Sequence, residues 1–332
     1  MTRKKISGPA AVIDIGSHSI RLIIGEKRKS GVHTLELLKN VVSIGRDTFE
    51  KNVISEKTVI NVLRTLRKYK TVIDTYQVGK VRVIATTAVR EAQNRDIFID
   101  TIYRKTGFRV EVLSVGDVVY YLDSFLYHQL REDYPLHSKT VLIAEFGSGT
   151  IDFSVMRNGY MLMSIGLPSG TLRLKNIVES LKGTKQEISQ ALREYVANEF
   201  RSLHRYVPDL KIDDAIVFGE DFSTCLRHIL TMEQEKHTFY EFREEDARRF
   251  SDICTETEPD ELVHAYHVPV EIADMAEMLA VMGDSMLTFM DRERLFVVES
   301  TLNYAVLSSM LEGRRLTAKH SQLDHLLSVG CG

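Results

Sequence analysis

Two stretches of this sequence repeat one motif without a gap, and the repeat constrains the fold more than any other feature. Residues 14–22 read DIGSHSIRL, and residues 145–153 read EFGSGTIDF. Each stretch follows an apolar run and leads into another, so each predicts a strand, an acidic residue, a turn of small residues and a second strand. A duplicated unit of this kind indicates two similar domains that face each other across a cleft.

The repeated motif also indicates a chemistry. A turn built from small residues lets backbone N–H groups approach an anion closely. The acid that ends each leading strand, Asp14 or Glu145, is of a type that hard cations prefer as a ligand. Two such turns across a cleft therefore suit a phosphate chain that is bound together with Mg²⁺.

Composition narrows the class of protein. The 332 residues suffice for two domains, and 44% hydrophobic with 27% charged residues is typical of a globular protein. No apolar run is long enough to span a membrane, and no apolar signal segment follows the basic residues 1–5, so we expect a cytoplasmic protein without membrane contact. The net charge of −3 offers no global attraction for a polyanion, and we expect no specific nucleic-acid binding.

Strand and helix patterns in both halves predict an α/β fold. The expected strands lie at 11–15, 20–26, 32–42, 81–85, 110–113, 140–145, 151–157, 160–165, 215–219 and 295–298. Two helices are expected to begin at Ser55 and at residues 168–171. Further helices are expected over 94–106, 117–130, 184–206, 269–282 and 302–311. Residues 132–138 carry a Pro and charges without periodicity and indicate a linker. We therefore predict one domain over residues 1–131 and a second over 139–332, with the last helix free to pack back on the first domain.

Four segments, in this order, resemble the motifs of the exopolyphosphatase/guanosine pentaphosphate phosphohydrolase (Ppx/GppA) family. Residues 13–22 and 145–152 resemble its first and second phosphate loops. Residues 85–92 (ATTAVREA) resemble its T-(S/A)-A-x-R-E-A signature, and residues 167–174 (LPSGTLRL) are similar to its L-P-x-G-x-x-R-L segment. The resemblance extends over most of the chain and is strongest in the first half.

The resemblance implies the two-lobed fold of actin, Hsp70 and sugar kinases (ASKHA), in which duplicated ribonuclease H-like domains flank a cleft. It implies a hydrolase, dependent on Mg²⁺ or Mn²⁺, that removes the terminal phosphate of inorganic polyphosphate or the 5′ γ-phosphate of guanosine pentaphosphate. Long members of the family carry further helical domains, so 332 residues match the short, two-domain form. Proteins of this form often pair, and we expect a homodimer. The stripe of Met275, Met278 and Met282 would form a dimer face or pack in the core.

The resemblance also assigns roles to individual residues. Phosphate contacts in the first loop fall on Gly16, Ser17, His18, Ser19 and Arg21, with His18 in place of the family's Asn. In the second loop they fall on Gly147, Ser148, Gly149 and Thr150. The cation ligands fall on Asp14, Glu145 and Asp152.

Two further residues would carry the reaction. Arg90 matches the family's phosphate-contacting arginine, although such a residue on its own is more often a surface ion-pair partner. Asp117 falls on the family's catalytic Glu and is one methylene shorter, while Val118 replaces a second Glu. Asp117 is therefore either the acid that assists the attacking water or only a helix-capping residue.

Two alternatives stay open. Altered positions at 117, 118, 120, 145, 148 and 152 fit a weak or inactive family member that binds polyphosphate or a nucleotide and acts in regulation. An actin-like ATPase or sugar kinase is the other alternative, which the motifs at 86–91 and 167–174 disfavour. The segment Gly219–Ser223 lies where the family has a glycine-rich sequence, and its two acids argue against a conventional nucleotide pocket there.

Overall fold

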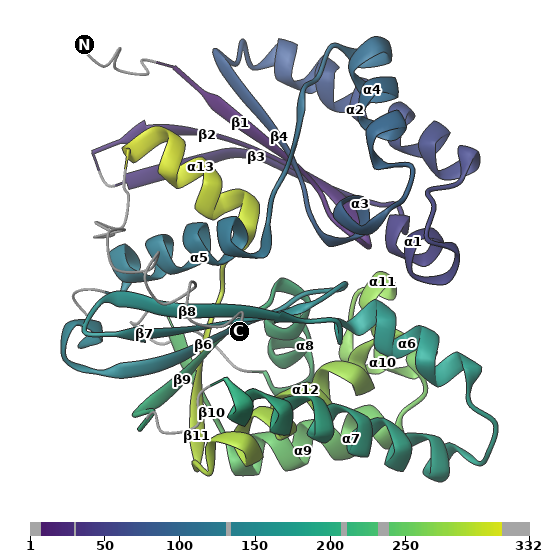
Figure 1. Ribbon diagram of the computed structural model, residues 1–332, viewed down its shortest axis with the longest axis vertical. Coiled ribbons are helices and arrows are strands. Elements are labelled where there is room, and N and C mark those ends of the chain that lie inside the picture. The colour runs from purple at the N-terminus through teal and green to yellow at the C-terminus, as the bar shows by residue number, and fades with distance from the viewer. Residues whose placement is uncertain (1–7, 30, 131–133, 207–210, 232–238, 314–332) are drawn as a thin grey trace, which may run out of the picture.

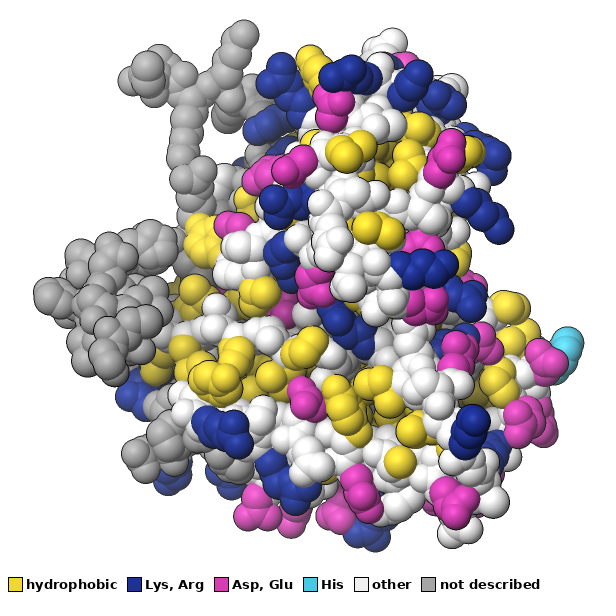
Figure 2. Space-filling view, turned by 45° about the vertical axis from the view of Figure 1, so that its right-hand side comes forward, with side chains coloured by type: hydrophobic (Ala, Val, Ile, Leu, Met, Phe, Trp, Pro, Cys, Tyr) yellow, Lys and Arg dark blue, Asp and Glu magenta, His cyan; other side chains and the backbone are white. Residues whose placement is uncertain are grey.

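The computed structural model describes residues 8–29, 31–130, 134–206, 211–231 and 239–313, which form two lobes, each built on one β-sheet (Figure 1). The expected domain limits at residues 131 and 332, and the start of the expected linker, lie outside the described residues. Within the described ranges, no helix combines the length and the apolar character needed to cross a membrane. On the face in Figure 2, Lys and Arg side chains lie among Asp and Glu side chains, so that face presents no field of one sign.

The first sheet has five strands in the order β3-β2-β1-β4-β5. They are β1 (Ala10–Ile15), β2 (Ser19–Arg28), β3 (Gly31–Val41), β4 (Lys80–Ala85) and β5 (Val110–Val112). The helices of this lobe are α1 (Ile44–Lys51), α2 (Glu56–Thr75), α3 (Thr87–Glu91) and α4 (Arg95–Thr106). β1, β2 and β3 form an antiparallel meander, and β4 and β5 run parallel to β1. Apolar residues of β1 and β2 share one buried core with α2 and α4.

The second sheet has six strands in the order β10-β11-β9-β6-β7-β8. They are β6 (Thr140–Phe146), β7 (Ile151–Arg157), β8 (Tyr160–Leu167), β9 (Asp214–Phe218), β10 (Phe239–Arg243) and β11 (Arg294–Val298). Its helices include α6 (Thr171–Ser180), α7 (Lys185–Ser202), α8 (Glu220–Leu230), α9 (Glu244–Glu256) and α10 (Pro259–Tyr266), with 3₁₀ turns at Leu136–Ser138 and Leu203–Arg205. This sheet starts as the first one does, with an antiparallel meander whose first strand pairs in parallel with a later strand. The two lobes therefore repeat one arrangement.

Two helices lie between the sheets. α5 (Val115–Gln129) follows β5, and α13 (Leu302–Glu312) follows β11 (Figure 1). Although α13 comes last in the described chain, it packs against β1 and β2 of the first sheet and against α5. One buried core contains residues from β1, β6, α5 and α13. The lobes are thus joined by shared apolar packing as well as by the chain.

Most expected strands and helices are confirmed. Both meanders are present, and Ser55 caps α2 by accepting a hydrogen bond from the Thr58 N–H group at 3.3 Å. The sequence patterns missed α1, α3, α8, α9, α10 and β10. Several of these are short elements, whose period is hard to distinguish from that of a loop.

The helix expected over 269–282 was wrong in its extent. The chain forms a short α11 (Val270–Ala273), interrupts at Asp274 and Met275, and continues as α12 (Ala276–Met290). Met275, Met278 and Met282 are at most 4% exposed. The methionine stripe therefore packs in the core and is not available as a dimer face.

Candidate functional site

The two loops of the repeated motif adopt the same hydrogen-bonded turn. The Gly16 N–H group donates to the Ser19 carbonyl at 3.0 Å, and the Gly147 N–H group donates to the Thr150 carbonyl at 3.0 Å. A Cβ atom on Gly147 would lie 2.9 Å from that Thr150 oxygen, so the turn leaves no room for a side chain there. The duplication seen in the sequence is thus a duplication of backbone geometry.

In the second loop the Gly147 and Ser148 carbonyl groups accept backbone hydrogen bonds, whereas two backbone N–H groups have no acceptor within the described part of the chain. At the start of α6, the N–H groups of Thr171 and Leu172 donate to the carbonyls of Gly147 and Ser148 at 3.1 and 2.9 Å. In contrast, none of the described residues accepts a hydrogen bond from the N–H groups of Ser148 and Gly149. Adjacent unpaired N–H groups in a tight turn form an anion-binding concavity.

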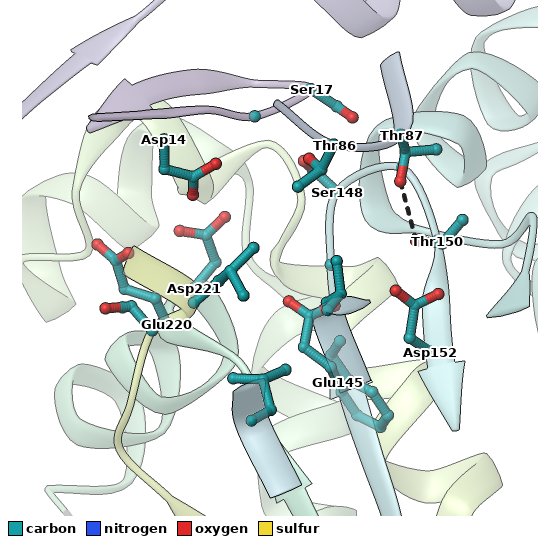
Figure 3. A pocket seen from close by; sticks show the side chains of 18 of the residues that line it. Asp14, Ser17, Thr86, Thr87, Glu145, Ser148, Thr150, Asp152, Glu220 and Asp221 are labelled. Atoms are coloured by element: carbon teal, nitrogen blue, oxygen red, sulfur yellow. Dashed lines mark hydrogen bonds between the residues drawn. The ribbon is translucent and has the colours of Figure 1, made fainter. Parts of the chain in front are cut away.

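Both loops line one cavity of about 80 Å³ between the lobes (Figure 3). Its hydroxyl-bearing lining residues include Ser17, Thr86, Thr87, Ser148 and Thr150, and its acidic ones are Asp14, Glu145, Asp152, Glu220 and Asp221. In Figure 3, Asp14 lies near Glu220 and Asp221, whereas Glu145 and Asp152 lie below Thr150. The Thr87 and Thr150 hydroxyl oxygens are hydrogen-bonded at 3.2 Å, so the lobes meet beside the cavity.

The two hairpins place different charges at equivalent positions. Asp14 lies opposite Arg21 across β1 and β2, and Glu145 lies opposite Asp152 across β6 and β7. Arg21 and Asp152 therefore occupy the same place in the two copies of the motif. The first hairpin presents a carboxylate with a guanidinium, while the second presents two carboxyl groups side by side.

Burial raises the pKa of all three carboxyl groups expected to bind a cation. The pKa of Glu145 rises to about 8 through burial and the nearby charge of Asp152. Burial raises the pKa of Asp152 to about 6, although Arg90 opposes the shift. Burial likewise raises the pKa of Asp14 to about 6 against the opposing charge of Arg21. Each of these groups is therefore harder to ionise than a carboxyl group in water, and a bound cation would favour its charged form.

The carboxyl groups fit Mg²⁺ chemically, although they do not form a preassembled cage. The Oδ1 atoms of Asp14 and Asp152 are buried and have no hydrogen-bond partner among the described residues. No three acidic, histidine or cysteine side chains in the described part of the chain are grouped closely enough to hold a metal together. Mg²⁺ commonly uses one or two carboxylates and completes its shell with water and substrate phosphates. The orphaned oxygen atoms meet that requirement.

The structure separates the expected phosphate contacts into two groups. The residues that line the cavity are Gly16, Ser17, Arg21, Gly147, Ser148, Gly149 and Thr150. Ser19 is buried but is not part of the lining. His18 lies toward a different cavity, where its Nε2 atom is 3.1 Å from the Glu271 carbonyl oxygen, and burial lowers its pKa. His18 therefore contacts the second lobe and not a ligand between the loops.

Arg90 lies one layer behind the cavity. Its guanidinium donates to the Leu113 carbonyl at 2.8 Å and to the Thr87 hydroxyl at 3.2 Å. Thr87 is itself hydrogen-bonded to Thr150 of the second loop. Arg90 thus positions a hydroxyl group that lines the cavity, and its charge favours the ionised form of Asp152.

Asp117 caps α5 and does not line the cavity. Its Oδ2 atom accepts hydrogen bonds from the Ser114 N–H group at 2.9 Å and the Ser114 hydroxyl at 2.6 Å, while the Asp117 N–H group donates to the Ser114 hydroxyl. This reciprocal arrangement is a capping box. Val118 and Leu122, one helical turn apart, are the residues that α5 presents to the cavity. Of the two roles open for Asp117, the geometry matches the capping role.

Several lining residues had little or no signal in the sequence. Thr86 and Thr87 fall inside the ATTAVREA motif, although only its arginine had been assigned a role. Ser300 and Thr301 lie just beyond the end of β11, after Glu299, and only their place near the end of a strand could have suggested them. The Ser300 hydroxyl is buried without a hydrogen-bond partner among the described residues.

Sequence comparisons find one matching family model and several distant relatives. A model of the Ppx/GppA phosphatase family matches residues 23–213, more than half of the chain. A bifunctional 3-dehydroquinate synthase/phosphatase of Fusobacterium nucleatum is 26% identical over 171 residues, which cover 49% of this chain and 25% of that protein. A guanosine-5'-triphosphate,3'-diphosphate pyrophosphatase of Photobacterium profundum is 30% identical over 113 residues, covering 34% and 23%. Exopolyphosphatase 1 of Mycobacterium leprae is 21% identical over 164 residues, covering 49% and 47%. The matched segments thus span less than half the length of these relatives.

Solved structures establish the fold. An exopolyphosphatase from Cytophaga hutchinsonii superposes with a TM-score of 0.80 at 21% identity, over 93% of this chain and all of that chain. The Ppx/GppA family member of Aquifex aeolicus gives a TM-score of 0.75 at 20% identity, over 92% of this chain and 98% of that one. The expected two-lobed actin-like α/β fold is confirmed by these likenesses. With the family model matching more than half of its length, this chain belongs to the Ppx/GppA phosphatase family.

Proposed function

We propose that this protein is a Mg²⁺-dependent phosphohydrolase that removes the terminal phosphate of inorganic polyphosphate or the 5′ γ-phosphate of guanosine pentaphosphate. One observation carries the proposal: two loops with the same turn line one cavity, and the second loop holds unpaired N–H groups at Ser148 and Gly149. Relatives that are named as an exopolyphosphatase and a guanosine-5'-triphosphate,3'-diphosphate pyrophosphatase support this class of substrate.

Asp14 and Glu145 would hold Mg²⁺, or Mn²⁺ in its place, with Asp152 beside them in the same cavity. The cation would neutralise negative charge on the phosphoryl oxygens as the phosphoanhydride bond breaks. Support for this assignment comes from the raised pKa values, because buried carboxyl groups that are hard to ionise gain from a divalent cation that replaces their protons.

The attacking water needs a proton acceptor inside the cavity, and we assign that role to Asp152. Its pKa of about 6 still leaves it mainly ionised at neutral pH, whereas burial and the charge of Asp152 keep the proton on Glu145 up to about pH 8 unless a bound cation displaces it. The nearby charge of Arg90 favours the ionised form of Asp152. Asp117 retains the structural role that its capping box describes.

A specific observation favours a second candidate function. Helix α5 presents Val118 and Leu122 to the cavity, so this wall is apolar and offers no proton acceptor. A cavity of this kind suits a protein that binds polyphosphate or a nucleotide and regulates another process with little or no hydrolysis. The two functions share the loops and differ only in turnover.

The test is phosphate release by purified protein with Mg²⁺, offered long-chain polyphosphate, guanosine pentaphosphate and ATP in parallel. The Asp152→Asn variant removes the assigned proton acceptor, and Asp117→Asn is the matched control because it makes the same chemical change outside the cavity. We expect release from polyphosphate or guanosine pentaphosphate that falls at least ~100-fold in Asp152→Asn and persists in Asp117→Asn, in line with general-base contributions of ~10²–10⁴-fold.

Each other outcome selects a different function. Binding without release from any substrate would select the regulatory candidate. Release from ATP alone would favour an ATPase or sugar kinase. Equal release by Asp152→Asn and the unmodified protein would contradict the role assigned to Asp152.

The expected homodimer and cytoplasmic location remain predictions. Since Met275, Met278 and Met282 are buried within the chain, a dimer would need another surface. Sedimentation velocity at micromolar concentration would measure the mass in solution, and a monomer at all concentrations would contradict the expected pairing.

A further inference from the structure

Four charged side chains from the two lobes meet at one side of the cavity: Arg21, Glu220 and Asp221 line it, and Lys39 contacts both carboxylates from outside the lining. Arg21 on β2 and Lys39 on β3 come from the first lobe, and Glu220 and Asp221 open α8 in the second. The Arg21 Nε atom lies 2.8 Å from Oε2 of Glu220. The Lys39 ammonium lies 3.2 Å from Oδ1 of Asp221 and 3.6 Å from Oε1 of Glu220. Each cation of the first lobe at this side of the cavity thus faces a carboxylate of the second.

A helix terminus alone does not account for this arrangement. Acidic residues in the first turn of a helix interact favourably with the helix dipole, and this interaction does not require the acids to be buried or paired. Here the Asp221 side chain is only 12% exposed and the Glu220 side chain 31%, and both contact cations of the other lobe. The positions of the Glu220 and Asp221 side chains therefore depend on the contact between the lobes as well as on the helix dipole.

The pairing leaves Arg21 with unused hydrogen-bonding capacity. Although its Nε atom and Oε2 of Glu220 are close, neither atom has a hydrogen-bond partner among the described residues. The contact is therefore an ion pair with poor hydrogen-bond geometry. A phosphate oxygen could offer the guanidinium a better acceptor, but it would have to displace the Glu220 carboxylate.

The charge balance of the cavity is unfavourable for a long polyanion. Arg21 is the single Lys or Arg among the described lining residues, beside five acidic side chains. The terminal phosphate is served by the backbone donors at Ser148 and Gly149, and a cation can neutralise the group being transferred. Each further phosphate of a polyphosphate chain adds negative charge that needs its own partner, and at this side of the cavity Arg21 and Lys39 are already paired.

We propose that Glu220 and Asp221 determine substrate specificity by chain length. They neutralise Arg21 and Lys39, so the cavity accepts a short phosphate terminus, as on a nucleotide, and disfavours long-chain polyphosphate. This inference rests on the proposed function, because it concerns the same phosphate site. Of the two substrates in the proposed function, the cavity would prefer guanosine pentaphosphate to long-chain polyphosphate.

The test compares the binding of tripolyphosphate and long-chain polyphosphate in the presence of Mg²⁺ by isothermal titration calorimetry. The double variant Glu220→Gln/Asp221→Asn removes both charges and keeps the shapes of the side chains. Polyphosphate affinity should be expressed per chain end, and the readout is its ratio to the tripolyphosphate affinity. We expect this ratio to rise on the order of tenfold for each carboxylate neutralised, since removal of a like charge at close range has an effect of this size.

Glu91→Gln is the matched control. Glu91 pairs with Arg173 across the lobes, so this change removes an interlobe ion pair without releasing Arg21 or Lys39. We expect no change in the ratio for this variant. High salt should also shrink the discrimination of the unmodified protein, because salt screens charges that are partly exposed.

The outcomes distinguish a wrong role for Glu220 and Asp221 from a wrong phosphate site. Normal tripolyphosphate binding with an unchanged ratio in the double variant would overturn the role of Glu220 and Asp221 alone. An equal rise in the ratio for Glu91→Gln would also overturn it, because loosening of the lobes would then explain the effect. Failure of the unmodified protein to bind either compound would overturn the proposed phosphate site together with this inference.

Discussion

Gly170 is the position where one added methyl group should do most damage to the second loop. It precedes α6, and a Cβ atom there would lie 2.5 Å from the Ser148 carbonyl carbon and 2.6 Å from the backbone N and C atoms of Gly149. These are backbone atoms, so no side-chain rotation relieves the contact. Reaching an ordinary contact distance of about 3.4 Å requires a shift of about 0.9 Å in the loop or in α6.

The shift sets the expected loss of stability and of phosphate binding in Gly170→Ala. Overpacking of this kind costs about 1–3 kcal/mol, and we expect the upper end because both contacting segments are backbone. The melting temperature should fall by several degrees, since ~1 kcal/mol corresponds to roughly 2–4 °C in a domain of about 200 residues. Displacement of the loop N–H groups by ~1 Å should lower phosphate turnover or binding by about 100-fold.

The assay compares Gly170→Ala with Gly79→Ala by thermal unfolding and by tripolyphosphate binding. Gly79 is the matched control, because a Cβ atom there would meet nothing within 4 Å. We expect Gly79→Ala to retain the melting temperature and affinity of the unmodified protein. If Gly170→Ala matched Gly79→Ala in both measurements, the close packing of α6 on the second loop would be refuted.

Two further predictions concern the cavity and its border. The folded state raises the pKa of Glu145 to about 8, so it binds more protons than the unfolded chain between about pH 4 and 8, and stability should fall as pH rises through that window. Glu145→Gln should flatten this slope and raise the melting temperature at pH 8, and an unchanged slope would contradict the pKa argument. The Arg173 guanidinium donates to the Gly149 carbonyl at 2.7 Å, pairs with Glu91 and lies over the Phe49 ring at 3.8 Å. Arg173→Lys should therefore cost about 1–2 kcal/mol and weaken phosphate binding, as measured by thermal unfolding and calorimetry, and wild-type values in both would refute its bridging role.

The repeated hairpin and its loops could be predicted because they depend on short-range rules. Alternating apolar residues, an acid at the strand end and glycine in a tight turn operate within about ten residues, and each is visible in the sequence. The same rules identified Ser55 as a helix cap. They could not identify the break at Asp274 and Met275, because apolar residues recur at helical spacing on both sides of it.

The residues that α5 presents to the cavity were harder to predict, because they depend on which face of the helix meets it. Asp117 and Val118 are neighbours in the chain, yet about 100° of helical rotation separates their side chains. The placement of α5 between the two sheets directs Val118 to the cavity and leaves Asp117 to cap the helix. A motif aligned by spacing alone does not contain that rotation.

The two small-residue loops, the meanders around them and the acids at their strand ends are all encoded locally in the sequence, because local hydrogen bonding and burial periodicity specify these features. What surrounds the loops depends on the packing of the whole chain: Arg90 lies behind Thr87, His18 turns toward Glu271, and Lys39 meets Asp221 across 182 positions of the chain. Contacts between residues so far apart depend on how the lobes pack, and no local pattern records that packing.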